Sequence, residues 1–184
     1  MSTQQAASGL GAKAPDFDLL GTDGKRHNLA SSRGPKGLLV MFICNHCPYV
    51  KAARARIVRD CSELAGHGIG SIAIMSNDPD DYPEDSFENM KKVATQFHYP
   101  FPYVSDETQD VARAYGAQCT PDFFGYNSVL ELQYRGRLDA SPRAESVAGA
   151  PRELFDAMVQ IAQTGRGPTE QVPSIGCSIK WKRR

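Results

Sequence analysis

The sequence lacks an excess of charge of either sign. Lys plus Arg and Asp plus Glu number 21 each in 184 residues, so the formal net charge is zero. A chain without excess positive charge has no general electrostatic attraction to nucleic acid or to an anionic membrane surface. We therefore expect neither partner, and we interpret the basic end at residues 180–184 as a solvated terminus.

The sequence also lacks a long hydrophobic stretch. Nowhere do about 18 apolar residues run together, and residues 1–13 carry neither the basic start nor the apolar core of a signal peptide. These absences predict a cytoplasmic protein with a flexible N-terminal segment over residues 1–13. With 41% hydrophobic and 23% charged residues, the chain can bury one substantial core, so we expect a single domain over residues 1–184.

Cysteine is scarce, and its spacing is irregular. Five cysteines are an odd number, unlike the paired framework of a small secreted protein. Two of them nevertheless stand three apart in Cys44-Asn45-His46-Cys47, directly after the apolar run 38–43 and before a helical pattern. A CxxC at a helix start brings two sulfurs within bonding reach, and the unpaired N–H groups of the helix favour thiolate. Because thiolates attack disulfides, the motif predicts a redox pair.

The hydrophobic pattern around this motif predicts an α/β fold. Residues 38–43 indicate a strand buried on both faces, and apolar positions at steps of three and four over residues 50–64 indicate an amphipathic helix that ends at Gly66 or Gly68. Residues 71–75 indicate a second buried strand. Together they predict a βαβ unit with the CxxC at the carboxyl edge of its sheet, where α/β folds place their sites.

Further elements are expected on both sides of this unit. They are a hairpin of Phe17–Leu20 and Arg26–Leu29, a helix from Pro83 to Phe97, a short helix from Glu107 to Tyr115, a strand pair of Phe123–Tyr126 and Leu130–Leu138, and a helix with Pro151 at its first position and Gly165 at its end. Residues 167–184 predict an irregular tail. We interpret the acids near the Pro83 helix as a solvated helix start: Asp78, Asp80, Asp81, Glu84, Asp85 and Glu88.

Three further segments carry a resemblance to a known family. Residues 14–17 (APDF) are similar to the start of peroxiredoxins, Thr120-Pro121 stands where thioredoxin-like proteins have a cis-proline, and residues 173–181 resemble the end of a peroxiredoxin-like CxxC group. The chain thus resembles the thioredoxin-like superfamily, in its AhpC/TSA, peroxiredoxin-like branch that carries a CxxC. The resemblance implies a thioredoxin-like fold, with a central mixed β-sheet flanked by helices, an N-terminal β-hairpin and a C-terminal tail.

The resemblance also implies roles for residues. It makes Cys44 the exposed attacking thiol and Cys47 the resolving thiol, with Thr120 and Pro121 presenting backbone to an extended substrate. His46, before the second cysteine, is similar to the histidine of oxidising members, and a protonated imidazole there would stabilise the thiolate. The implied partners are a disulfide-containing protein or small molecule and a thiol electron donor. We expect no cofactor and no metal.

The sequence departs from both parent patterns. Cys47 fits the peroxidatic cysteine of peroxiredoxins, but Cys44 replaces their Thr and Val40 replaces their Pro. Thr120 stands where the Arg that polarises peroxide is expected. The buried acid of thioredoxin falls on Leu38, so no general base can be named.

Three functional classes therefore remain. We favour a thiol-disulfide oxidoreductase; the alternatives are a thiol peroxidase with antioxidant activity and a metal-binding protein that uses Cys44, Cys47, Cys119 and a histidine. Cys119 is a candidate third thiol because it precedes the expected cis-proline. Cys177 is either a third redox thiol or an ordinary packed residue. Cys61 falls on the apolar stripe of its helix and is expected in the core.

Overall fold

The computed structural model describes residues 9–144 and 147–183. The predicted flexible segment lies partly outside this range, in residues 1–8, and so does the last residue of the tail. Within the described part, the backbone N–H of Gly11 donates to the carbonyl of Leu132, with 2.7 Å between N and O, and Lys13 forms a β-bridge with Glu131. Residues 9–13 are therefore tied to the body of the protein.

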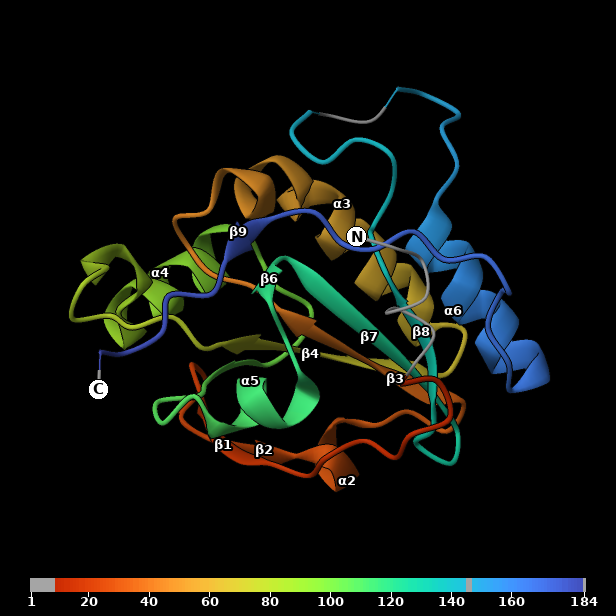
Figure 1. The fold of residues 1–184 in the computed structure, drawn as a ribbon, viewed down its shortest axis with the longest axis horizontal. Coiled ribbons are helices and arrows are strands. Elements are labelled where there is room, and N and C mark those ends of the chain that lie inside the picture. The colour runs from red at the N-terminus through yellow and green to blue at the C-terminus, as the bar shows by residue number, and fades with distance from the viewer. Residues whose placement is uncertain (1–8, 145–146, 184) are drawn as a thin grey trace.

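A seven-stranded mixed sheet forms the centre of the molecule (Figure 1). Its strand order is β2-β1-β5-β4-β3-β7-β8. The strands are β1 (Asp18–Gly21), β2 (Arg26–Asn28), β3 (Gly37–Phe42), β4 (Ile69–Met75), β5 (Tyr103–Ser105), β7 (Asp122–Asn127) and β8 (Leu132–Gly136). β3 runs parallel to β4 and antiparallel to β7, and β1 and β2 form the predicted hairpin. The α/β prediction is confirmed.

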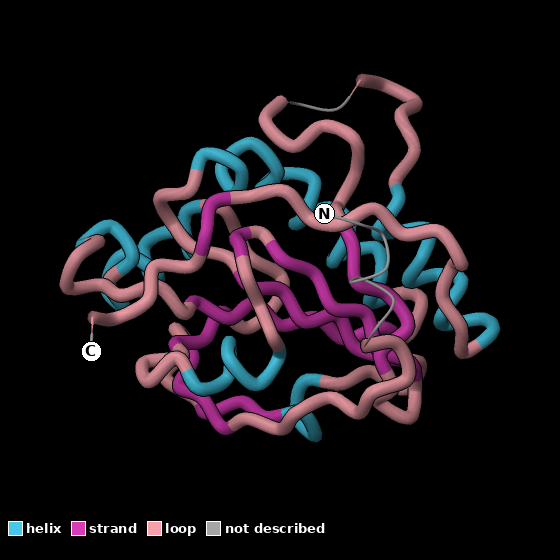
Figure 2. Tube along the Cα trace, in the orientation of Figure 1, coloured by secondary structure: helices cyan, strands magenta, loops and turns pink. Residues whose placement is uncertain are grey.

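Helices lie on both sides of this sheet (Figure 2). They are α2 (Leu29–Ser32), α3 (Pro48–Ala65), α4 (Phe87–Gln96), α5 (Asp110–Tyr115) and α6 (Glu153–Thr164), with one 3₁₀ turn, η1 (Pro83–Asp85). In the described residues, no helix combines the length and the apolar character needed to cross a lipid bilayer.

Strand β3 lies near the middle of the sheet and divides the core in two. Leu39 and Met41 pack with apolar residues of α3 and α6, whereas Leu38 and Val40 belong to the cluster that includes residues of α5. Every residue of β3 is buried, as expected for a strand between two helical layers. This buried strand carries the chain directly into the CxxC loop.

Helix α3 begins immediately after the CxxC. Cys47 is its N-cap residue, Pro48 is its first residue, and Gly66 is its C-cap, so the predicted helix and its end are confirmed. Pro48 costs little here because the N–H groups of a first helical turn have no partner within the helix. Ile57 and Leu64 are among the side chains that α3 buries against the sheet.

The predicted helix over residues 83–97 is two separate pieces. Ser86 has extended backbone between η1 and α4, and its side chain accepts a hydrogen bond from the Asn89 N–H. A serine in this position is a favourable N-cap, so a new helix begins rather than the old one continuing. Because of this break, η1 lies against the CxxC loop and does not continue into α4 as one solvated helix.

Other boundaries also differ from those predicted: α5 begins at Asp110 rather than Glu107, and β8 spans Leu132–Gly136 rather than Leu130–Leu138. The last helix begins after Arg152, so Pro151 precedes it, while Gly165 ends it as predicted with φ of 76°. Leu29 begins the short α2 rather than ending the hairpin, because the side chain of Asn28 caps that helix.

The tail contains a strand that the sequence pattern did not reveal. β9 (Cys177–Ser178) pairs antiparallel with β6 (Cys119–Thr120) to form a second, two-stranded sheet. The register places Thr120 opposite Cys177. In Figure 1 the tail, drawn in blue, runs from the end of α6 past β6 toward α4.

Candidate active site

Cys44 and Cys47 lie in the loop between β3 and α3, and both face β6. The two sulfurs contact Thr120: Sγ of Cys44 lies 3.4 Å from its Oγ1, and Sγ of Cys47 lies 3.2 Å from its carbonyl oxygen. The peptide bond between Thr120 and Pro121 is cis. Thus the structure brings together four of the predicted site residues: Cys44 and Cys47 lie against the backbone segment of Thr120 and Pro121.

Neither cysteine of the pair is exposed. The exposed fraction is 0% for Cys44 and 0% for Cys47. The prediction of an exposed Cys44 is therefore wrong, because β6 packs directly against both sulfurs.

The pKa values of the two buried thiols are shifted in opposite directions. A hydrogen bond from the Cys44 thiol is the main cause that lowers the pKa of Cys47 to about 4, and the backbone of Val50 and the thiol and backbone of Cys177 act in the same direction. The same bond to Cys47 raises the pKa of Cys44, as do burial and the negative charge of Asp85. Cys47 also caps α3, where the helix dipole stabilises negative charge. These pKa shifts favour thiolate at Cys47 and the proton at Cys44, whereas the order of attack expected from the sequence, with Cys44 first, stays a prediction.

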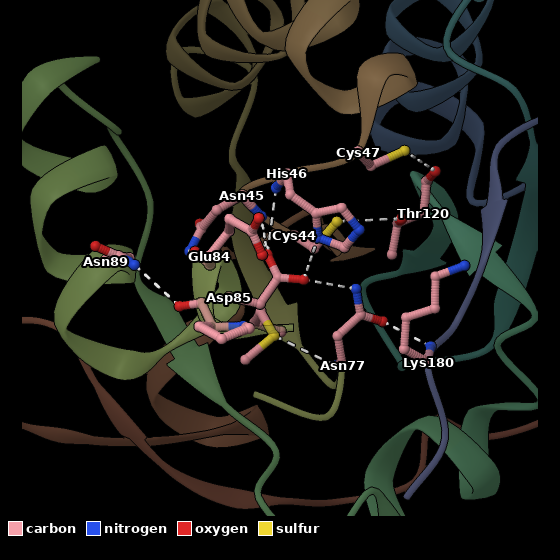
Figure 3. A network of polar contacts seen from close by, with 12 residues as sticks. Cys44, Asn45, His46, Cys47, Asn77, Glu84, Asp85, Asn89, Thr120 and Lys180 are labelled. Carbon is pink, nitrogen blue, oxygen red and sulfur yellow. Dashed lines mark hydrogen bonds and ion pairs between the residues drawn. The ribbon is translucent and has the colours of Figure 1, made fainter. Parts of the chain in front are cut away.

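A buried carboxylate, Asp85 of η1, holds the loop between the cysteines (Figure 3). It accepts hydrogen bonds from the backbone N–H of Asn45 at 2.7 Å and of His46 at 3.2 Å, and from Nδ2 of Asn77 at 2.9 Å. A fourth bond, of 2.5 Å, joins it to Nδ1 of His46. The prediction that the acids of residues 78–88 are solvated is wrong for Asp85, which has no exposed surface, and for Asp78, which is 6% exposed.

Asn45 locks the other side of the same loop. Its side-chain amide donates to the carbonyl of Glu84 at 3.0 Å, and its side-chain oxygen accepts from the hydroxyl of Tyr103 at 2.8 Å. With the bond to Asp85, these contacts hold the CxxC loop to η1 and to β5. The loop is therefore pre-organised before any substrate binds.

His46 lies between Asp85 and Cys44. A ring nitrogen of His46, a carboxylate oxygen of Asp85 and Sγ of Cys44 all lie within 4.8 Å of one another. The ring stacks on Tyr82 with 5.3 Å between centroids, and 21% of its side chain is exposed. An imidazole oriented by a carboxylate in this way can accept the proton of a neighbouring thiol. This dyad is a candidate for the general base that the sequence did not identify.

The metal-ligand set considered as an alternative is not assembled as predicted. Among the residues that the structure describes, the group able to hold an ion is Cys44, His46 and Asp85. Cys119 is turned elsewhere: its Sγ lies 3.6 Å from the carbonyl oxygen of Pro121, and burial, followed by the charge of Asp122, raises its pKa to about 12. Since Asp85 already accepts four hydrogen bonds, we interpret the cluster as proton-handling rather than metal-binding.

The two remaining cysteines have different surroundings. Cys61 is 5% exposed, and burial raises its pKa to about 12, so the prediction of a core residue is confirmed. Cys177 is half-buried, packs against the cluster that contains the CxxC, and is among the groups that lower the pKa of Cys47. The spacing of Cys177 from the CxxC could not have revealed this contact.

The fold, with a CxxC facing a cis-proline, defines a thioredoxin-like protein. The AhpC/TSA family model matches residues 10–141, and the chain belongs to that family. The family and the fold predicted from the sequence are both confirmed.

Similar proteins agree with this assignment. The chain is similar to an uncharacterised conserved protein from Geobacillus kaustophilus, with a TM-score of 0.89, 45% identity and coverage of 95% of this chain and 93% of that one. It is 28% identical over 129 residues to the thiol-disulfide oxidoreductase ResA of Geobacillus thermodenitrificans, a match that spans 66% of each chain, just under two thirds of the ResA length. A thiol:disulfide interchange protein from Chlorobium tepidum shares the fold, with a TM-score of 0.62, 20% identity and coverage of 85% of this chain and 99% of that one.

Proposed function

We propose that this protein is a thiol-disulfide oxidoreductase that exchanges its Cys44–Cys47 pair with the disulfide of a protein or small molecule. The observation that carries the proposal is a pair of buried thiols that both contact Thr120, directly before the cis-proline. The similarity to ResA supports the same chemistry. We also propose the cytoplasmic location expected from the sequence, since a reducing compartment supplies a donor thiol.

The reaction proceeds in two exchanges. The Cys47 thiolate attacks one sulfur of the substrate disulfide, a bond forms between them, and the other substrate sulfur leaves as a thiolate that takes up a proton. Cys44 then gives its proton to His46 and attacks Sγ of Cys47, which releases the second substrate thiol. Two electrons pass from the protein to the substrate, and the protein is left with a Cys44–Cys47 disulfide. A donor thiol reverses these steps and restores the pair.

The His46–Asp85 dyad acts on the second exchange. Cys44 must lose its proton before it can attack, and burial and the charge of Asp85 oppose that loss. When neutral His46 accepts the proton, Asp85 stabilises the imidazolium through the bond to Nδ1. Asp85 therefore keeps the pKa of Cys44 raised before the reaction, and it stabilises the imidazolium once the proton has been transferred.

The proposal predicts that the reduced protein prefers disulfides to peroxide. Stopped-flow mixing with glutathione disulfide or with hydrogen peroxide can be followed by the fluorescence of Trp181, which follows Lys180, the tail residue whose N–H donates to Asn77. We expect a rate constant with glutathione disulfide at least about tenfold above that of a free thiol at equal thiolate fraction, and a rate constant with peroxide near that of the free thiol.

The matched control is a variant that carries both Cys44→Ser and Cys47→Ser, which should react with neither compound at the fast rate. A peroxide rate constant orders of magnitude above that of the free thiol would contradict the proposal, and would establish the thiol peroxidase alternative instead.

The lowered pKa of Cys47 predicts that the thiolate of the reduced protein forms at low pH. Ultraviolet absorbance of the thiolate in the reduced protein should appear as pH rises through about 4, whereas an ordinary cysteine ionises near 9. Because the Cys44 thiol is the main stabilising donor, Cys44→Ala should shift this transition toward higher pH, and Cys44→Ser, which keeps a hydroxyl donor, should shift it less.

Cys47→Ser should remove the low-pH transition altogether. If the transition instead survives in Cys47→Ser and disappears in Cys44→Ala, the thiolate belongs to Cys44 and the order of attack predicted from the sequence is restored.

A further inference from the structure

The tail strand β9 lies against the backbone that was expected to hold an extended substrate. β9 pairs antiparallel with β6, the strand that ends at the cis-proline, and places Cys177 opposite Thr120. Sγ of Cys47 lies 3.2 Å from the carbonyl oxygen of the same Thr120. The chain thus presents one of its own cysteines to the CxxC, in the arrangement in which a substrate strand would present its sulfur.

Gly176 shows how closely the tail approaches β6. A Cβ atom added to this residue would lie 2.1 Å from the carbonyl oxygen of Thr120 and 3.1 Å from the nitrogen of Pro121. Since Cβ atoms do not approach backbone atoms this closely, any side chain at position 176 would push the strand away. The absence of a side chain at Gly176 is therefore required for Cys177 to reach its place.

The tail is anchored on both sides of the site. Ile179 is 3% exposed and joins the apolar cluster below β3, and its N–H donates to the carbonyl of Gln118. The N–H of Lys180 donates to the side chain of Asn77 at 2.9 Å, and Asn77 in turn donates to Asp85 (Figure 3). The tail and the CxxC loop are thus held by one continuous network.

We propose that Cys177 is a third redox thiol of this site, which accepts the disulfide from the CxxC by bonding to Cys47. The inference rests on the proposed function, because that activity forms the Cys44–Cys47 disulfide. Cys177 loses its proton and attacks Sγ of Cys47; the Cys47–Cys177 bond forms, the Cys44–Cys47 bond breaks, and Cys44 takes up a proton. The protein neither gains nor loses electrons in this step.

The exchange moves the disulfide from a buried place to a more accessible one. Cys44 and Cys47 have no exposed surface, whereas Cys177 is half-buried. An incoming donor thiol can therefore reach Cys177 while β9 stays in place. Reduction of the protein through Cys177 does not require the CxxC itself to be uncovered.

The test uses glutathione disulfide as oxidant and intact mass as readout, in the Cys44→Ser variant. With Cys44 absent, a disulfide at Cys47 has Cys177 as its partner within the site, so the oxidised variant should lose two hydrogen atoms and carry no glutathione. Peptide mapping should place the bond between Cys47 and Cys177. In the Cys44→Ser, Cys177→Ser variant glutathione should stay bound, and the single variant should carry less than about a tenth of that amount, because exchange within one chain outruns exchange between molecules.

The competing thiol is tested in the Cys44→Ser, Cys119→Ser variant, which should behave like Cys44→Ser alone. Stable glutathione on Cys44→Ser itself would overturn the inference, as would loss of the internal disulfide in the Cys119 variant. Failure of the proposed function is a separate result: glutathione disulfide would then form no Cys44–Cys47 bond in the Cys177→Ser variant, in which the disulfide cannot move to the tail.

A second variant keeps both thiols of the expected bond, Cys47 and Cys177, and moves only the strand. Gly176→Val should displace β9 from Thr120 and reduce the yield of the Cys47–Cys177 disulfide at least about tenfold in the Cys44→Ser background. Ser178→Val, a change at an exposed neighbour in the same strand, is the matched control and should keep the yield. Equal yields in the two variants would contradict the role of the β6–β9 pairing.

Discussion

Cys47→Ser is expected to abolish disulfide exchange, with a loss on the order of a thousandfold or more, as for removal of other catalytic nucleophiles. The reason is that Cys47 holds the thiolate, through its bond from Cys44 and its place at the start of α3. Cys44→Ser should instead permit the first exchange and prevent the normal second one. The measurement is the rate of reduction of glutathione disulfide, together with the mass of the protein after reaction.

This comparison is cleanest in chains that also carry Cys177→Ser, because the third thiol cannot then release the substrate. In that background, Cys44→Ser should accumulate a mixed disulfide on Cys47, and Cys47→Ser should accumulate none. A mixed disulfide on Cys44 in the Cys47→Ser chain would contradict the assignment and make Cys44 the attacking residue.

Asp85→Ala is expected to lower the free energy of unfolding of the reduced protein by about 2–4 kcal/mol. The carboxylate is fully buried, and its removal leaves donors of Asn45, His46 and Asn77 without their acceptor. The midpoint of urea unfolding measures the change. In the surviving folded protein, Cys44 should ionise at lower pH, because the negative charge of Asp85 raises the pKa of that thiol.

The matched control is Asp81→Asn, which changes an acid of the same segment that is 46% exposed and paired with Arg183. Exposed ion pairs contribute about 0–1 kcal/mol, so this change should barely move the midpoint. Equal midpoints for the Asp85 and Asp81 variants would contradict the structural role of the buried carboxylate.

The centre of the fold could be predicted because its signals are local. The apolar run that forms β3, the periodicity of α3 and the glycine at position 66 lie within one continuous stretch, and each is determined by near neighbours. The cysteine pair at the junction could be identified for the same reason. Its surroundings could not, because they come from residues distant in the chain.

Asp85 and Cys177 illustrate what a local pattern misses. Asp85 belongs to a strongly acidic stretch, which in most proteins is solvated, yet hydrogen bonds to a loop forty positions earlier bury it. Cys177 belongs to a two-residue strand, too short to show alternation, whose partner lies near residue 120. The resemblance correctly located the CxxC and the proline, but said nothing of what lies over them.

The pairing of β9 with β6 also sets a condition on substrates. A strand tethered to the same chain is present at an effective concentration on the order of millimolar or more. Burial of Ile179 favours its bound state further, by about 1.5–3 kcal/mol, or roughly ten- to a hundredfold. An extended substrate that pairs with β6 must outcompete this internal strand, so extended peptides that pair only weakly with β6 are excluded by competition before any sulfur is exchanged.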